Sequence, residues 1–147
     1  MKQAVSTPVV YFESAAGTLL EDPAGFIRAI WGSNAQQYTT ADAQEFFSQM
    51  MAGMQRRGWS RMFVDQTHMR PFTAEEQRWI SQEWLPRAVT HGGYRHGAVV
   101  VSPNVMVRLA TAYITTQVLN LSLIYRSFDS AAAAQAWLLE QPISPGK

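Results

Sequence analysis

The stretch RMFVDQTHMRPFTAEEQRW, residues 61–79, carries the signals from which the rest of the fold is predicted. It opens with an apolar run, Met62–Val64, which predicts a short strand buried on both faces at the centre of a sheet. It closes with Thr73 and, three residues later, Glu76, the spacing of a capping box that begins a helix. The stretch therefore predicts a strand, a polar loop and a helix.

The polar side chains of this loop form the candidate site: Asp65, Thr67, His68, Arg70 and Thr73. They follow a predicted central strand, and open α/β sheets bind ligands at the carboxyl ends of their strands. One interpretation is a surface that binds a partner or a ligand. The other is that these residues only end the strand and start the helix, with Asp65 capping backbone N–H groups and His68 on the surface.

An acid–base pair of Asp65 and His68 is the third interpretation of the loop. A triad also needs an activated nucleophile and an oxyanion site, and the chain has no G-x-S-x-G elbow. We therefore assign no catalytic residue and expect no enzymatic activity.

A second apolar run, Val99–Val101, predicts another buried parallel strand. Further strands are predicted at both ends of the chain from β-branched and aromatic residues, at 8–14, 18–22, 25–32 and 121–128. Gly17 is expected to supply the positive φ of the first turn.

Four amphipathic segments are predicted to be helices, beginning near Thr40, Thr73, Ser102 and Ser130. Thr40 is expected to cap the first and Gly58 to end it. Ser102 is expected to cap the third, with Pro103 at its first position, and Asp129 or Ser130 to cap the last. Pro86 should kink or end the second helix.

The sequence predicts an inward orientation for one group of apolar residues and leaves two placements open for another. In the third helix, roughly 104–119, the residues expected to point inward are Val105, Met106, Leu109, Tyr113 and Val118. Around the polar loop, an exposed interaction surface or a buried core are both open for Met69, Phe72, Trp79 and Trp84.

The order of elements is a β-meander followed by αβαβαβα, which predicts an α/β fold with a mixed, mainly parallel sheet covered by about four helices. A chain of 147 residues, 47% of them hydrophobic, suits one domain, which we place at 1–141 with a short flexible tail at 142–147.

Composition excludes several functional classes. The net charge is +1 and no dense basic block occurs, so we expect no nucleic-acid partner. There is no cysteine, and the three histidines show no metal-ligand spacing, so we expect no metal and no cofactor. No stretch has the length of a membrane span, and the first residues lack a secretory signal, so we expect a cytoplasmic protein.

Four segments together resemble a known family: FVDQTHMRPFTAEEQRWISQEWLPRAV, GAVVVSP, RLATAYITTQV and YRSFDSAAAAQAWL. The chain resembles the STAS-like domains of anti-sigma-factor antagonists, and within them a bacterial branch of small, mostly uncharacterised single-domain proteins. The resemblance in the order of elements covers nearly the whole chain, although the distinctive motifs are packing and capping patterns rather than chemistry.

The resemblance implies a non-enzymatic regulatory or scaffold domain that docks a protein partner or, in some relatives, a small or lipid-like ligand. Well-known members are phosphorylated on a serine in an Asp-Ser pair at the start of the helix after the central strand. Thr73 lies near that position, but the acidic neighbour and the glycine are absent, so a helix cap is the preferred interpretation.

Three functions follow as hypotheses. The first is a domain that binds an unidentified protein through the loop from Asp65 to Thr73. The second is a domain that binds a small apolar ligand between the sheet and the helices holding Trp79 and Tyr113. The third is a small hydrolase-like enzyme that uses Asp65 and His68. The residues do not predict an oligomeric state.

Overall fold

The computed structural model describes residues 7–32, 37–117 and 120–144. Over these ranges six strands form one sheet in chain order: β1 (Val9–Ser14), β2 (Gly17–Asp22), β3 (Phe26–Trp31), β4 (Arg61–Asp65), β5 (His96–Val100) and β6 (Ile124–Phe128). β1, β2 and β3 pair antiparallel, and β3 to β6 pair parallel. The predicted α/β class with a mixed, mainly parallel sheet is confirmed.

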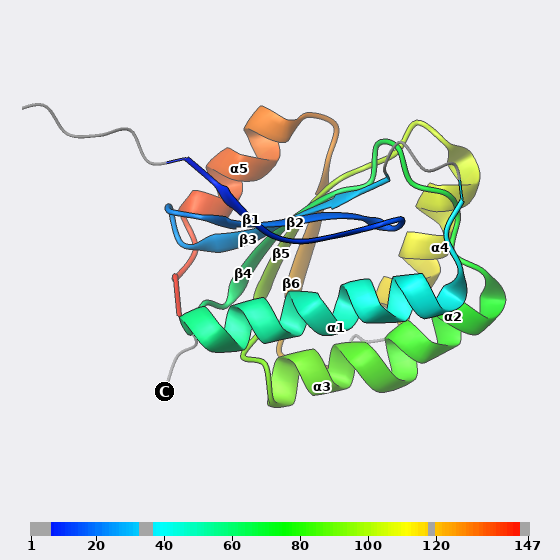
Figure 1. The fold of residues 1–147 in the computed structure, drawn as a ribbon, viewed down its shortest axis with the longest axis horizontal. Coiled ribbons are helices and arrows are strands. Elements are labelled where there is room, and N and C mark those ends of the chain that lie inside the picture. The colour runs from blue at the N-terminus through cyan, green and yellow to red at the C-terminus, as the bar shows by residue number, and fades with distance from the viewer. Residues whose placement is uncertain (1–6, 33–36, 118–119, 145–147) are drawn as a thin grey trace, which may run out of the picture.

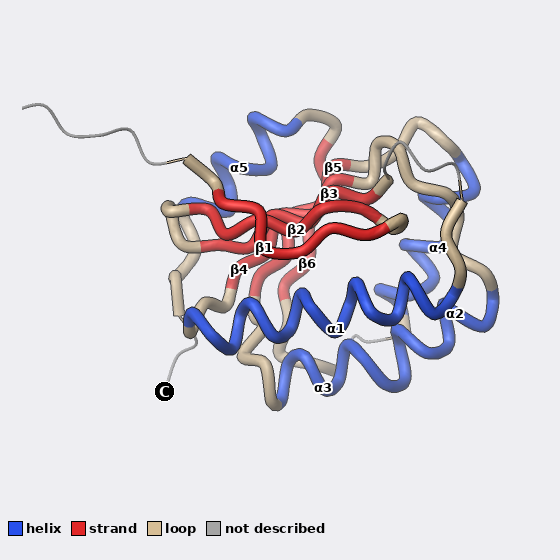
Figure 2. Tube along the Cα trace, viewed as in Figure 1, coloured by secondary structure: helices blue, strands red, loops and turns tan. Residues whose placement is uncertain are grey.

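The helices cover both faces of this sheet. They are α1 (Thr40–Arg57), the continuous run of α2 (Ala74–Trp79), η1 (Ile80–Trp84) and α3 (Leu85–Thr90), then α4 (Val105–Thr116) and α5 (Ala131–Leu139). Parallel strands in sequential order with crossovers of one hand place the connecting helices on one face. Figures 1 and 2 show α1 and α3 on one side of the sheet and α5 on the other.

The two apolar runs lie side by side at the centre of the sheet, as predicted. β4 pairs with β5 so that Phe63 is opposite Ala98 and Val64 is opposite Val99. All four side chains are buried. These strands are apolar on both faces because helices cover both faces.

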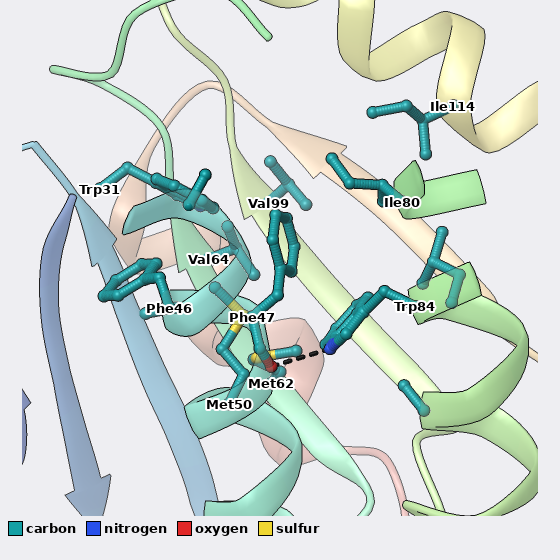
Figure 3. Packing of buried hydrophobic residues seen from close by; sticks show 14 of the residues in the cluster. Trp31, Phe46, Phe47, Met50, Met62, Val64, Ile80, Trp84, Val99 and Ile114 are labelled. Atoms are coloured by element: carbon teal, nitrogen blue, oxygen red, sulfur yellow. Dashed lines mark hydrogen bonds between the residues drawn. The ribbon is translucent and has the colours of Figure 1, made fainter. Parts of the chain in front are cut away.

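Alternate residues of β3 supply two separate cores. Ile27, Ala29 and Trp31 belong to the large core under α1, η1 and α4. Phe26 belongs to the small core under α5, with Ile30 packed against it. Figure 3 shows the large core, where Trp31 and Phe46 meet edge to face with ring centroids 4.6 Å apart. The alternation of residues along β3 thus reflects a strand that is buried on both of its faces.

Helix α1 begins one residue earlier than predicted. Thr39, not Thr40, is its cap: the Thr39 hydroxyl accepts from the Asp42 N–H, and the Asp42 carboxylate accepts from the Thr39 N–H. Thr40 instead donates its hydroxyl to Glu76 Oε2 at 2.8 Å. Gly58 ends the helix in the left-handed conformation, as predicted. By local chemistry alone, either Thr39 or Thr40 could cap the helix. The hydrogen bond of Thr40 with Glu76, 36 residues along the chain, distinguishes the two.

Pro86 does not end the second helix, which continues to Thr90. The turn before the proline is a π turn, in which the Leu85 N–H donates to the Ile80 carbonyl five residues back. Proline has no N–H and its ring crowds the preceding turn. The wider turn accommodates both, and the expected break becomes a local change of helical type.

The third helix is turned opposite to the prediction. Asn104, not Ser102, is its cap, so Pro103 precedes it. Val105, Met106, Leu109 and Tyr113 point outward, with exposed fractions of 63%, 61%, 59% and 48%. The residues that face the core are Val107, Ala110, Thr111 and Ile114. Both sets of residues recur at helical spacing, and the sheet packs against the set with the smaller side chains. Val118, also predicted to point inward, lies outside the described residues.

The remaining expectations concern the ends of elements. Ser130 is the cap of α5, one of the two residues predicted. Gly17 has the expected positive φ, 156°, but it is the first residue of β2, and Ala15 and Ala16 form the turn itself. A Cβ on Gly17 would lie 2.1 Å from the Ile30 carbonyl oxygen. The expected tail is held at its start, since the Ser60 N–H donates to the Ile143 carbonyl at 2.8 Å. None of the described helices has the length and apolar character needed to cross a membrane.

Candidate functional site

The predicted site residues lie on the loop between β4 and α2, at the carboxyl edge of the parallel strands. Asp65 ends β4, where its Oδ1 accepts hydrogen bonds from the Thr67 N–H at 2.9 Å and the Thr67 hydroxyl at 2.6 Å. This is the turn that an aspartate forms with the residue two positions on. The interpretation of Asp65 as a cap of loop N–H groups is therefore confirmed.

His68 is not joined to Asp65. Its side chain is exposed, and no hydrogen bond or ion pair between the two side chains occurs in the described part of the chain. The backbone of His68 packs against β3 instead, because a Cβ on Gly32 would lie 2.7 Å from the His68 carbonyl oxygen. In the described part of the chain, the geometry therefore does not pair Asp65 with His68.

Arg70 is engaged inside the protein rather than presented to solvent. Its guanidinium donates to both carboxylate oxygens of Glu76 at 2.8 Å and to the Tyr38 carbonyl at 3.2 Å. It also stacks on the Tyr38 ring, 4.0 Å from the centroid. A bidentate pair of this kind fixes both side chains in direction as well as in distance. Arg70 therefore ties the loop to the start of α2 and to the segment before α1.

Glu76 is the centre of this arrangement. Its side chain is 2% exposed, and it accepts hydrogen bonds from Arg70, from the Thr73 N–H and from the Thr40 hydroxyl. Burial alone raises its pKa, but these hydrogen bonds, first of all those from Arg70, lower the pKa to about 2. Burial, partly offset by the charge of Arg70, raises the pKa of Tyr38 to about 12, so its hydroxyl stays protonated.

Thr73 forms the predicted capping box. Its hydroxyl accepts from the Glu76 N–H at 3.1 Å, and Glu76 Oε1 accepts from the Thr73 N–H at 2.9 Å. A phosphate on this hydroxyl would place added negative charge beside a buried carboxylate. The geometry fits a helix cap.

Replacement of Thr73 by alanine is expected to lower the free energy of unfolding by about 1 kcal/mol, since one helix N–H loses its acceptor. Urea denaturation measures this loss. The matched control is Thr73→Ser, which keeps the hydroxyl and should keep most of the stability. A regulatory phenotype of Thr73→Ala at unchanged melting temperature would instead support phosphorylation.

The apolar residues around the loop belong to the core. Met69, Phe72 and Trp84 are 5%, 6% and 4% exposed, and Trp79 is half-buried. The indole N–H of Trp84 donates to the Phe47 carbonyl at 2.8 Å, which locks η1 onto α1. Of the two placements left open by the sequence, the structure shows the buried one.

The polar side chains of the loop thus form their hydrogen bonds mostly within the protein. The carboxylate, guanidinium and capping hydroxyl of the loop are all used internally, and His68 alone is free on the surface. Over the ranges that the structure describes, no cluster of three or more histidine, aspartate or glutamate side chains is placed to hold a metal ion. The candidate site residues lie on one loop, where Asp65, Arg70 and Thr73 stabilise the edge of the sheet.

The exposed face of α4 is the feature that the residues alone did not reveal. We call Val105, Met106, Leu109 and Tyr113 the α4 surface. Their spacing of three and four residues places them on one side of the helix. Arg108 is the single charged residue of α4, and it forms no ion pair within the described ranges. The sequence does carry a signal for this exposed face. The segment of α4 has two apolar stripes, although one stripe is enough to pack against a sheet.

Comparison of the chain with known proteins gives no relative. No family model matches it, and neither a curated protein nor a solved structure matches it significantly.

Proposed function

We propose that the protein is a non-enzymatic, cytoplasmic interaction domain of STAS-like type that docks a protein partner on the α4 surface. The observation that carries the proposal is four large apolar side chains, each about half exposed or more, on one helix face. Together they expose on the order of 400 Å², the size of the largest apolar patch on a typical monomer, which is often functional.

The chemistry of the α4 surface indicates the kind of partner. One helix face offers roughly half of the about 800 Å² that each protein buries in a standard interface. A stable dimer through this face alone is therefore disfavoured, whereas a single amphipathic helix matches it in length and shape. Arg108, exposed beside the stripe, favours a carboxylate next to the apolar residues of that helix.

One further observation supports the STAS-like, regulatory part of the proposal. The structure has the order of elements on which the resemblance was based: a β-meander, three strand–helix–strand units and a last helix. The loop from Asp65 to Thr73, which the sequence predicts as the partner-binding segment, is occupied by its own hydrogen bonds. We therefore place the docking surface on α4 and not on this loop.

Replacement of Leu109 by glutamate is expected to abolish partner binding, because it places a charge at the centre of the apolar stripe. The fold should persist, since Leu109 is 59% exposed. The matched control is Leu139→Glu, which charges an apolar side chain on α5 that is 45% exposed. Co-purification from the native host measures binding, and thermal unfolding measures the fold.

A photo-crosslinking benzoylphenylalanine in place of Met106 identifies what covers the surface. The expected product is a peptide from another protein with apolar residues at helical spacing and an acidic neighbour, and it should disappear in Leu109→Glu but not in Leu139→Glu. Crosslinking to a second copy of this chain, or binding that survives Leu109→Glu, overturns the proposal.

A further inference from the structure

A partly open cavity of about 40 Å³ lies between the sheet and the helices, on the side of the large core. Its apolar walls come from β4, η1 and α4, with Met62, Val64, Ile80, Trp84 and Ile114 among them. Figure 3 shows these side chains converging from separate elements. Neither Trp79 nor Tyr113 lines it, although a pocket between their helices and the sheet was expected.

The cavity is not lined by apolar groups alone. Gln66 and Tyr94, which are 3% and 1% exposed, also line it, together with Thr111, Thr115 and Tyr125. The Thr111 hydroxyl donates to Gln66 Oε1 at 3.1 Å. Within the described residues, neither the Gln66 amide nitrogen nor the Tyr94 hydroxyl donates a hydrogen bond to another protein group. Two donors on residues that are more than nine-tenths buried thus lack an acceptor in the part of the chain that the structure describes.

Such donors are costly unless something satisfies them. A buried polar group left without a partner costs about 1–3 kcal/mol. Buried water removes this cost where a cavity has polar walls and enough room, about 10–15 Å³ for each molecule. By that measure the cavity has room for roughly three water molecules.

The lining also decides against other occupants. Among the described residues no charged side chain lines the cavity, so an ion would be buried there without a counter-charge. An apolar molecule would leave the Gln66 amide and the Tyr94 hydroxyl unpaired. Burial raises the pKa of Tyr94, which keeps its hydroxyl protonated and able to donate. The occupant must be small, neutral and able to accept hydrogen bonds.

We propose that this cavity is an internal hydration site, in which two or three ordered water molecules bridge Gln66 and Tyr94 beneath α4. The waters accept from the Gln66 amide and the Tyr94 hydroxyl, and donate to the free lone pairs of the hydroxyls around them. The site is separate from the α4 surface, so either proposal can fail without the other.

Xenon distinguishes a hydrated cavity from a dry one, because dry apolar cavities take it up. Methyl chemical shifts of Val64, Ile80 and Ile114 are recorded for the full chain with and without xenon. We expect no change in the wild type and clear shifts in the double variant Gln66→Leu/Tyr94→Phe, which removes both donors. Xenon binding in the wild type overturns the proposal.

Direct detection of the water is the second measurement. Long-lived exchange between bound water and nearby protons is expected in the wild type, weakened in Tyr94→Phe and unchanged in the control Tyr113→Phe, whose hydroxyl is on the exposed face of α4. A wild type without these signals, or a bound molecule heavier than water in native mass spectrometry, contradicts the inference. Because Tyr94→Phe removes one oxygen only, the fold should be retained.

Discussion

Glutamine in place of Glu76 is expected to lower the free energy of unfolding by about 3 kcal/mol at pH 7. The carboxylate has its pKa lowered from 4.5 to about 2 in the folded protein, and a shift of this size corresponds to about 3 kcal/mol. Removing one partner of a buried ion pair also leaves the other uncompensated. Arg70 would face an amide with a single acceptor oxygen and an NH₂ donor, so the pairing of its two N–H groups with two oxygens is lost.

The dependence on pH makes this prediction specific. The folded-state pKa is the lower one, so the stabilisation by Glu76 is complete above about pH 4.5 and is lost as the pH falls through about 2. The difference in stability between the wild type and Glu76→Gln should therefore be constant near neutral pH and shrink below pH 4.5. Urea denaturation at a series of pH values measures it.

The control for Glu76→Gln is Glu75→Gln, in the same helical turn but exposed to solvent. Exposed substitutions of this kind usually change stability by less than about 0.5 kcal/mol. A difference between Glu76→Gln and the wild type that persists unchanged to pH 2 would mean that packing, not charge, holds this residue. The ion pair with Arg70 would then be dispensable for stability.

The parts of this network differ in how far they can be predicted from the sequence. The capping box of Thr73 and Glu76 is local, and three residues of spacing reveal it. The contacts of Glu76 with Thr40 and of Arg70 with Tyr38 join residues 36 and 32 positions apart. No local pattern specifies these contacts, so the sequence predicts Thr40 as a cap and Arg70 as a binding residue.

Burial on two faces was predictable for the same local reason. Met62–Val64 and Val99–Val101 have no polar alternation, which only a strand covered on both sides tolerates. The orientation of α4 was not predictable, because the outward Val105 and Leu109 have the same spacing of four residues as the inward Ala110 and Ile114. The buried stripe also carries Thr111, whose hydrogen bond to Gln66 joins it to the end of β4. The inner face of α4 thus includes the polar Thr111, whereas the usual rule would assign a polar residue to the exposed face.

Methionine in place of Arg61 is the second large effect that we expect, a loss of about 3–5 kcal/mol in the free energy of unfolding. Arg61 opens β4 and is 2% exposed. Its guanidinium donates to four backbone carbonyls, those of Ala24, Gly25, Leu138 and Gln141. One side chain thus joins the turn between β2 and β3 to the end of α5, and methionine leaves all four acceptors without this donor.

Burial lowers the pKa of Arg61, and the charge of Asp22 opposes that shift. Arginine remains charged in proteins even so, and lysine lacks the planar fork that reaches several acceptors at once. Arg61→Lys should therefore recover only part of the loss. The expected fall in melting temperature for Arg61→Met is roughly 10 °C, measured by calorimetry.

Hydrogen exchange separates the two roles that Arg61 combines. If its hydrogen bonds hold α5, Arg61→Met should raise exchange rates first in α5 and in the turn at Ala24 and Gly25, ahead of α1. Arg78→Met is the control, because Arg78 is exposed on α2. A loss below about 1 kcal/mol, or uniform exchange across the sheet, would show that Ala134 and Leu138 dock the last helix through apolar burial alone.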